Sequence, residues 1–148
     1  MNVTPATERA VASLEKLRDG LQSLAERHVA EADVYHVGSR LALRCGEVAR
    51  GFGDGEASEP TPAGNLSART QQSGPAEGMA LLHDLRELAV EAHGAQIDVL
   101  IVQQGAMAAR DRELMMAAKA ATAEIGRVDK WLQTRIKETA PQALAALP

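Results

Sequence analysis

The sequence predicts an all-α protein, a four-helix bundle with a long flexible connector between its second and third helices. The long segments are rich in Leu, Ala, Glu and Arg, and the only aromatic residues are Tyr35, Phe52 and Trp131. Small and unbranched apolar residues suit helix–helix packing, whereas sheets favour β-branched and aromatic ones. Apolar residues also recur every three or four positions, as they do along one face of a helix. A chain of this length is expected to form a single domain, residues 1–148.

The first helical hairpin is predicted over residues 4–52. Thr4 is expected to cap the first helix, with Pro5 at its first position, and this helix should end near residue 29. The second helix follows after only a few residues, so the two should pack antiparallel. The two apolar stripes are Ala10, Leu14, Leu17, Leu21, Leu24 and His28, and then Val34, Val37, Leu41, Cys45, Val48 and Phe52.

A flexible connector is predicted over residues 53–77, where Gly, Pro, Ser and Thr dominate and the few apolar residues show no period. Connectors of this length are uncommon inside compact domains. An extended chain covers about 3.3 Å per residue, so this one is long enough to return along the whole bundle. The sequence is compatible with such a crossover to a parallel third helix and also with a simple flexible insertion.

The second helical hairpin is predicted over residues 78–140. One helix should span about 76–109 and the next about 111–139, with Asp111 as the N-cap of the last helix and Pro141 ending it. The last helix carries the most regular stripe in the chain, which predicts that it packs firmly against the others. That stripe is Leu114, Ala118, Ala121, Ile125, Val128, Leu132 and Ile136.

Histidines and carboxylates gather in residues 83–98, HDLRELAVEAHGAQID, and such side chains are common metal ligands. On a helical wheel the apolar residues of this segment face the other helices, and most of the polar ones point away from the bundle centre. No Glu-x-x-His motif occurs in the chain. We therefore predict no metal and no cofactor. The alternative is an iron site, and it requires His83, Glu87 and Glu91 to turn inward.

Three polar residues are predicted on core faces, namely His28, Gln96 and Gln103. Buried amides need hydrogen-bond partners, so interhelical hydrogen bonds are the favoured interpretation. The alternative is that these three residues are the polar contacts of a pocket for a small apolar ligand. Cys45 lies on an apolar stripe and is expected to be an inert, packed thiol.

The third helix is apolar on a second side as well. A helix that is apolar on two sides is usually buried on two sides, and exposed apolar stripes usually mark contact surfaces. We therefore predict a homo-oligomer that forms through this helix, with the connector folding over the stripe as the alternative. The predicted self-association residues are Met79, Val90, Gly94, Ile97, Ile101 and Ala108, with Gly105 beside them.

Charge and composition indicate which partners and compartments to expect. The formal net charge is −4 with both signs interspersed, so no nucleic-acid partner is expected. The longest apolar runs are far too short to span a membrane. A single cysteine and the lack of a leader-like N-terminus favour a cytoplasmic protein. No catalytic motif occurs, and the cations of the last helix are interpreted as a solvated face.

Three stretches resemble a group of small, uncharacterised actinobacterial proteins with a ferritin-like four-helix arrangement. They are LAERHVAEADVYHVGSRLAL, HDLRELAVEAHGAQIDVLIVQQGAMAARDREL and DKWLQTRIKETAPQAL. The resemblance implies a bundle with a long crossover between two hairpins. In ferritin-like proteins inward glutamates and Glu-x-x-His motifs hold two irons, and this sequence departs from that pattern, so iron chemistry is not carried over.

The favoured function is therefore a non-enzymatic helical bundle that acts through self-association or other protein contacts. An iron-binding oxidase or storage protein is the second hypothesis, and a binding module for a small ligand is the third.

Overall fold

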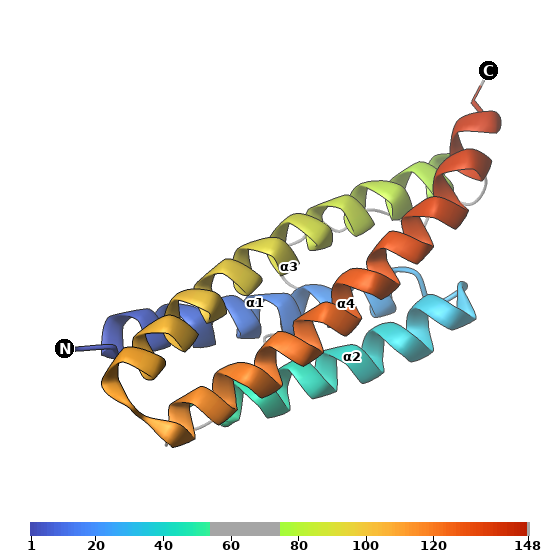
Figure 1. Ribbon diagram of the computed structural model, residues 1–148. Coiled ribbons are helices and arrows are strands. Elements are labelled where there is room, and N and C mark those ends of the chain that lie inside the picture. Colours follow the sequence, from blue (N-terminus) through green and yellow to red (C-terminus); the bar gives the residue numbers. More distant parts are fainter. Residues whose placement is uncertain (54–74, 148) are drawn as a thin grey trace.

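The computed structural model describes residues 1–53 and 75–147, and these residues form four helices and no strand (Figure 1). The helices are α1 (Thr4–Arg27), α2 (Ala32–Arg50), α3 (Pro75–Ala109) and α4 (Arg112–Ala145). The all-α, four-helix prediction is therefore confirmed. No helix within the described ranges is both long enough and apolar enough to cross a membrane.

The helices form a closed ring in which α1 contacts α2 and α3, and α4 contacts α2 and α3. Side-chain pairs establish the direction of α3, because the start of α1 meets the end of α3. Ser13 donates a hydrogen bond to Asp98, while Arg27 at the other end of α1 lies 3.3 Å from Asp84. Helix α1 is thus antiparallel to α3.

Helices α2 and α4 are antiparallel by the same reasoning. Asp33, early in α2, pairs with Arg135, late in α4, and Arg44 pairs with Glu124. Because α1 runs antiparallel to both α2 and α3, the latter two helices are parallel and lie diagonally across the ring (Figure 1).

The parallel direction of α2 and α3 has a consequence for the connector. The end of α2 and the start of α3 lie at opposite ends of the bundle (Figure 1). This direction of α2 and α3 is the one that the crossover alternative needs. The predicted flexible connector itself, residues 53–77, lies for the most part outside the described residues.

Leucine, valine and alanine side chains from all four helices make up the core, as the composition predicts. The predicted stripes face inward, and Leu14, Leu85, Ile125 and Leu132 are each 1% exposed or less. Small residues on α3 and α4, such as Ala95, let the helices approach closely, and hydrophobic burial holds the ring together.

Two predicted helix ends are wrong. Thr4 is the first helical residue rather than the cap, and the N-cap is Val3. Pro141 does not end α4, which continues to Ala145. A proline removes one backbone hydrogen bond, but the turn after it is held because Ala143 is 4% exposed and packs beside Gly78 of α3.

The turn between α3 and α4 follows the prediction closely. Asp111 caps α4, and its side chain accepts a hydrogen bond of 3.1 Å from the backbone N–H of Leu114. Arg110 has a φ of 57°, and the N–H groups of Arg110 and Asp111 donate to the carbonyls of Met107 and Ala106. This pairing is the Schellman motif, in which the left-handed residue is usually glycine.

Candidate functional surfaces

Three carboxylates of α3 face α1, spaced seven residues apart. Asp84 lies 2.8 Å from His28 Nε2, and Asp98 accepts the hydrogen bond from Ser13. The middle carboxylate, Glu91, lies against Gly20. Three acids of residues 83–98, the segment that suggested a metal site, therefore lie between α1 and α3. Each of them contacts a different part of α1, so they do not converge on one point.

Glu91 is half buried, and its Oε2 atom is buried with no hydrogen-bond partner among the described residues. A Cβ atom at position 20 would lie 2.9 Å from that oxygen, so Gly20 leaves the space that Glu91 occupies. Burial raises the pKa of Glu91, the charge of Lys16 lowers it and the charge of Glu87 raises it. The site therefore disfavours the ionised form of this carboxyl relative to its protonated form.

The alternative iron site is not supported by the positions of its proposed ligands. His83 and Glu87 are exposed on α3 rather than turned inward, and Glu91 faces α1. A cation in a bundle core needs ligands that converge from facing helices. Within residues 1–53 and 75–147 no group of three or more His, Cys, Asp or Glu residues could hold a metal ion.

The three polar residues predicted in the core have different environments. His28 is 4% exposed and is bonded to Asp84. Gln96 is exposed, so its core placement is wrong, and Gln103 is half buried at the edge of α4. The two amides lie on the same side of α3, at the margin of its buried face. The buried face is narrower on this side than the helical wheel predicted, so neither amide is fully buried. They do not form a pocket together with His28.

Two buried residues of charged type, Arg18 and Glu124, were missed by sequence reasoning. Arg18 is 6% exposed and donates from its Nε atom to Asp19 at 2.9 Å. Glu124 is 3% exposed and accepts hydrogen bonds from Arg44 and Arg127. Charged residues are rarely buried unless they are paired. Asp19 and Arg127 lie on the same helices as the residues that they pair with, but Arg44 belongs to α2, and a wheel of α4 alone cannot show that contact.

Cys45 is completely buried close to these charges. The pKa of the Cys45 thiol is raised to about 12, mainly because the thiol is buried; the negative charge of Glu124 also raises this pKa, and the positive charge of Arg18 opposes the rise. A thiol of this kind is protonated at neutral pH and is a poor nucleophile.

A pocket of about 640 Å³ lies at the end of the bundle where α1 begins and α2 ends. Its walls include apolar side chains such as Val11, Phe52 and Leu114, and its most buried charged residue is Arg18. Gly46 makes room for that arginine, since a Cβ atom at position 46 would lie 3.2 Å from Arg18 Cδ. A few polar groups on apolar walls are typical of small-molecule sites.

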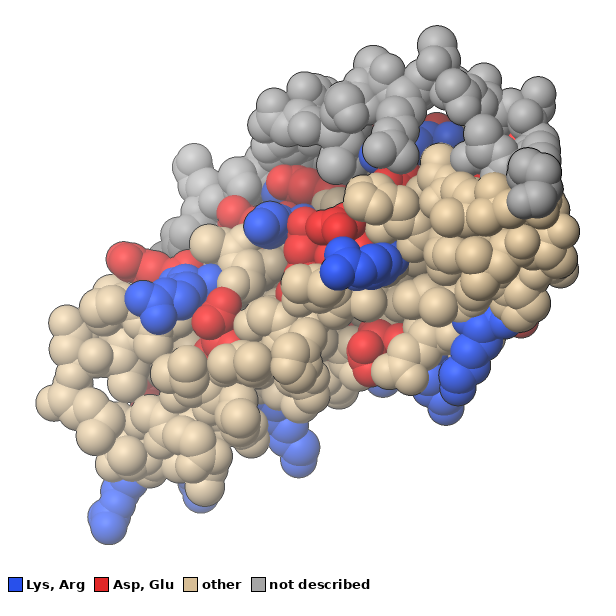
Figure 2. Space-filling view, turned by 90° about the horizontal axis from the view of Figure 1, so that it is seen from above, with Lys and Arg blue, Asp and Glu red and all other residues tan. Residues whose placement is uncertain are grey.

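The outer side of α3 exposes large apolar side chains. Val90 is 60% exposed, Ile97 45% and Ile101 49%, and Gly94 has no atom within 4 Å of its Cβ position. We call Val90, Gly94, Ile97, Ile101, Gln104 and Ala108 the outer stripe, because they alternate at spacings of four and three. Figure 2 views the bundle from above, over α3, and shows broad uncharged areas there.

Two other predicted members of this surface lie elsewhere. Met79 is half buried near the start of α3. Gly105 faces α1, since a Cβ atom there would lie 3.0 Å from Val3 Cγ1. The exposed side chains of Leu100, Met107 and Met116 extend the apolar surface toward α4 instead.

Comparisons of the chain with known protein families, with curated proteins and with solved structures found no match. The resemblance to ferritin-like bundle proteins therefore stays a prediction that rests on the three sequence stretches.

Proposed function

We propose that this protein is a non-enzymatic helical bundle that self-associates by packing the outer stripe of α3 against the same stripe of a second copy. The observation that carries the proposal is the exposure of Val90, Ile97 and Ile101 along one line of α3. Apolar side chains arranged in this way on an otherwise well-packed helix mark a contact surface. A second copy is the occupant that the stripe itself favours.

The stripe is self-complementary if the two helices run antiparallel. A two-fold axis midway between Ile97 and Ile101 would place each of these residues opposite the other in the second copy. The same axis places Val90 opposite Ala108. It also places Gly94, which has open space at its Cβ position, opposite the larger side chain of Gln104. Such isologous contacts are the usual basis of homodimers.

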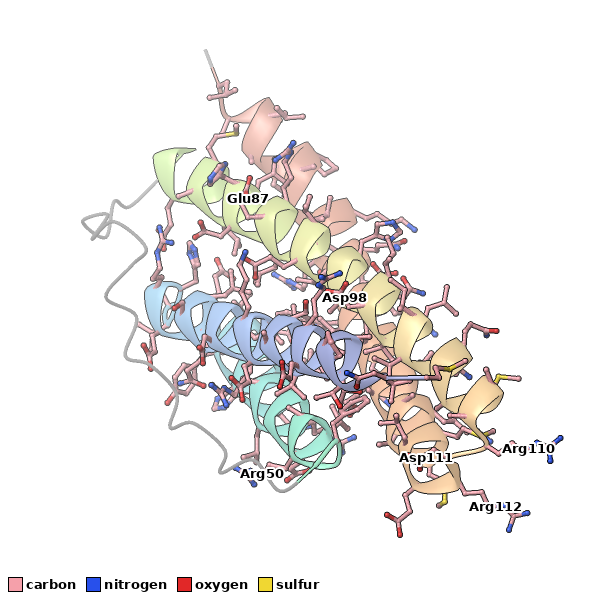
Figure 3. All side chains as sticks on the ribbon, turned by 90° about the vertical axis from the view of Figure 1, so that its left-hand side faces the viewer. Arg50, Glu87, Asp98, Arg110, Asp111 and Arg112 are labelled. Carbon is pink, nitrogen blue, oxygen red and sulfur yellow. The ribbon has the colours of Figure 1, made fainter. Side chains whose placement is uncertain are left out.

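Charge also favours the antiparallel direction. Glu87 lies near one end of the stripe, and Arg110 and Arg112 lie beyond the other end (Figure 3). An antiparallel pair brings Glu87 toward Arg110 and Arg112 of the second copy, whereas a parallel pair brings each of these charges against its own copy. The contribution is small, because Glu87 already lies 2.8 Å from Arg86 and Asp111 lies between the two arginines. Antiparallel helix dipoles also attract each other.

The size of the stripe indicates a modest affinity. From Val90 to Ala108 it is about 27 Å long at 1.5 Å per residue and about 10 Å wide. This footprint is smaller than the ~800 Å² per partner of a standard interface. We therefore expect a dimer that dissociates on dilution, with Leu100, Met107 and Met116 adding contact area at its edge.

Sedimentation velocity over a range of protein concentrations tests the proposal. Wild-type protein should shift from monomer to dimer as the concentration rises, and Ile101→Asp should stay monomeric because each interface would then hold buried carboxylates. Leu43→Asp is the matched control, since Leu43 is 61% exposed on α2 and outside the stripe. Circular dichroism should show the same helix content in all three proteins.

Two results would contradict the proposal. One is a wild-type protein that stays monomeric at every concentration. The other is an equal effect of Ile101→Asp and Leu43→Asp on association. An unfolded Ile101→Asp protein would contradict it as well, because the stripe would then belong to the core.

The directions of the helices support a ferritin-like arrangement, because two antiparallel hairpins lie side by side with α2 and α3 parallel. We infer this relationship from the direction of the helices and from the sequence resemblance. A cytoplasmic location is proposed on the composition, in which Cys45 is the only cysteine.

A second candidate function is the binding of a small, largely apolar molecule, and the pocket of about 640 Å³ favours it. The ligand would contact Val11, Phe52 and Leu114 rather than the glutamines predicted from the sequence. An environment-sensitive apolar dye should bind wild-type protein and lose affinity in Ala12→Trp, which narrows the pocket. Ala123→Trp, an exposed position on α4, is the control.

A further inference from the structure

The strongest unexplained arrangement of charges lies between α2 and α4, which run side by side (Figure 1). Two arginines from different helices converge there on one buried carboxylate. Arg44 Nη1 of α2 lies 3.3 Å from Glu124 Oε1, and Arg127 Nη1 of α4 lies 2.9 Å from Glu124 Oε2. Each oxygen of Glu124 therefore accepts from a different guanidinium group.

The exposure of the three side chains differs sharply. The side chain of Glu124 is 4% exposed, while those of Arg44 and Arg127 are 48% and 59% exposed. Each arginine presents five N–H donors in a rigid fork, so donors remain on the solvent side after the bond to Glu124 is made. Glu124 therefore holds the side of each guanidinium group that faces the protein, and the N–H donors that face solvent can still bind another group.

The charges of this cluster do not balance. One carboxylate holds two guanidinium groups close together, which leaves a net charge of +1 and a repulsion between the two arginines. A single arginine would be enough to neutralise Glu124. Arg40 and Lys130 lie on exposed positions about one helical turn from Arg44 and Arg127, and Glu47 is an exposed acid one turn after Arg44. Cations therefore still outnumber acids around the cluster.

We propose that Arg44 and Arg127 form a clamp that binds a small oxyanion on the solvent side of Glu124. A phosphate or carboxylate group placed there would accept hydrogen bonds from both forks and balance the excess charge. Glu124 is the positioning residue, since its two oxygens hold one Nη atom of each arginine, at 3.3 and 2.9 Å, and it does not itself touch the ligand. The clamp is independent of the outer stripe of α3, because α2 and α3 lie diagonally across the ring.

Titration calorimetry with pyrophosphate, at constant ionic strength and pH, tests the clamp. Trp131, the only tryptophan, lies one turn beyond Arg127 on α4, so its fluorescence gives a second readout. Wild-type protein should show saturable binding. Arg44→Gln and Arg127→Gln should each bind at least tenfold more weakly, because each removes one of the two forks.

The matched control is Arg86→Gln, since it removes the same charge from an arginine on α3 whose side chain is 71% exposed. It should bind pyrophosphate as wild-type protein does. Arg127→Lys keeps the charge but loses the planar fork, and it should bind more weakly than wild type even though it folds in the same way. Citrate in place of pyrophosphate distinguishes a carboxylate ligand from a phosphate ligand, and tighter binding of either one identifies the source.

The proposal is overturned if neither anion shows saturable binding to wild-type protein. It is also overturned if Arg86→Gln weakens binding as much as Arg44→Gln and Arg127→Gln do, because the effect would then come from net charge alone. Circular dichroism of each variant ensures that a loss of binding is not a loss of fold.

Discussion

Replacing Glu91 by glutamine should stabilise the protein at neutral pH. Glu91 Oε2 is buried between α1 and α3, and no described residue hydrogen-bonds to it. Burial raises the pKa of this carboxyl, which means that the ionised form is penalised in the folded state. Glutamine has almost the same shape but carries no charge, so Glu91→Gln removes the penalty and keeps the packing against Gly20.

The size of the gain follows from the environment of the carboxylate. A buried polar group without a partner costs about 1–3 kcal/mol, and more when it is charged. Glu91 is only half buried, and the charge of Lys16 favours the ionised form, so solvent and this lysine offset part of the cost. We expect Glu91→Gln to gain about 1 kcal/mol. For a chain of this size the gain corresponds to a rise of about 2–4 °C in Tm.

The pH dependence distinguishes this cause from a general effect of charge. A raised pKa means that the folded state holds the Glu91 proton more tightly than the unfolded chain does. The resulting stabilisation is fully present below the unfolded pKa and is lost as pH rises through the folded pKa. Urea unfolding should therefore show the advantage of Glu91→Gln at about pH 7 and little advantage near pH 3, which is below the pKa of Glu91 in the unfolded chain, so that this carboxyl is protonated in both states.

Glu47→Gln is the control for this prediction, because Glu47 is an exposed glutamate on α2. Its effect on the free energy of unfolding should stay within about 0.5 kcal/mol at both pH values. A Glu91→Gln protein that is less stable than wild type at neutral pH would refute the reasoning. A gain of equal size at both pH values would show that the carboxylate charge is not the cause.

Three further predictions follow from the fold. Cys45, whose thiol pKa is raised to about 12, should react with iodoacetamide only as fast as the protein unfolds, which mass spectrometry with and without denaturant can measure. Arg110→Gly should raise the free energy of unfolding by about 1 kcal/mol, because glycine accepts the φ of 57° without strain. Excision of residues 56–72 should prevent the native topology. Helix α2 is about 28 Å long at 1.5 Å per residue, whereas the shortened connector would reach only about 17 Å. Native-like thermal unfolding of the shortened chain would contradict the crossover.

The sequence was sufficient to predict the helices and the faces that they bury. The stripes of α1 and α4 repeat every three or four residues, and Leu14 and Ile125 are buried as that repeat requires. The cap at Asp111 was predictable for a similar reason, because its signal lies within one turn. Pro141 was misread since the contact between Ala143 and Gly78, which holds the turn after it, joins residues far apart in the chain.

The polar contacts of the core could not be predicted from one helix at a time. A wheel of α3 places Glu91 near the boundary of the apolar face. Whether a side chain at that boundary is exposed to solvent depends on the residue that the neighbouring helix places against it. Glu124 presents the same difficulty, because its buried position is stable only with Arg44 of α2 and Arg127 beside it. Whether a charged residue such as Glu124 is buried therefore depends on the helix packed against it as well as on its own helix.

A signal for the contact between α1 and α3 nevertheless exists in the sequence, and it lies in two matching repeats. Asp84, Glu91 and Asp98 recur every seven residues on α3, and each has a polar or small partner on α1. Those partners are Ser13, Gly20 and Arg27, which also recur every seven residues but in the opposite order. Two antiparallel helices that share a seven-residue repeat keep the same residues opposite each other along their length. The repeat thus determines the register of α1 on α3, and this register directs the acids of α3 toward α1 and leaves the outer stripe of the same helix facing outward.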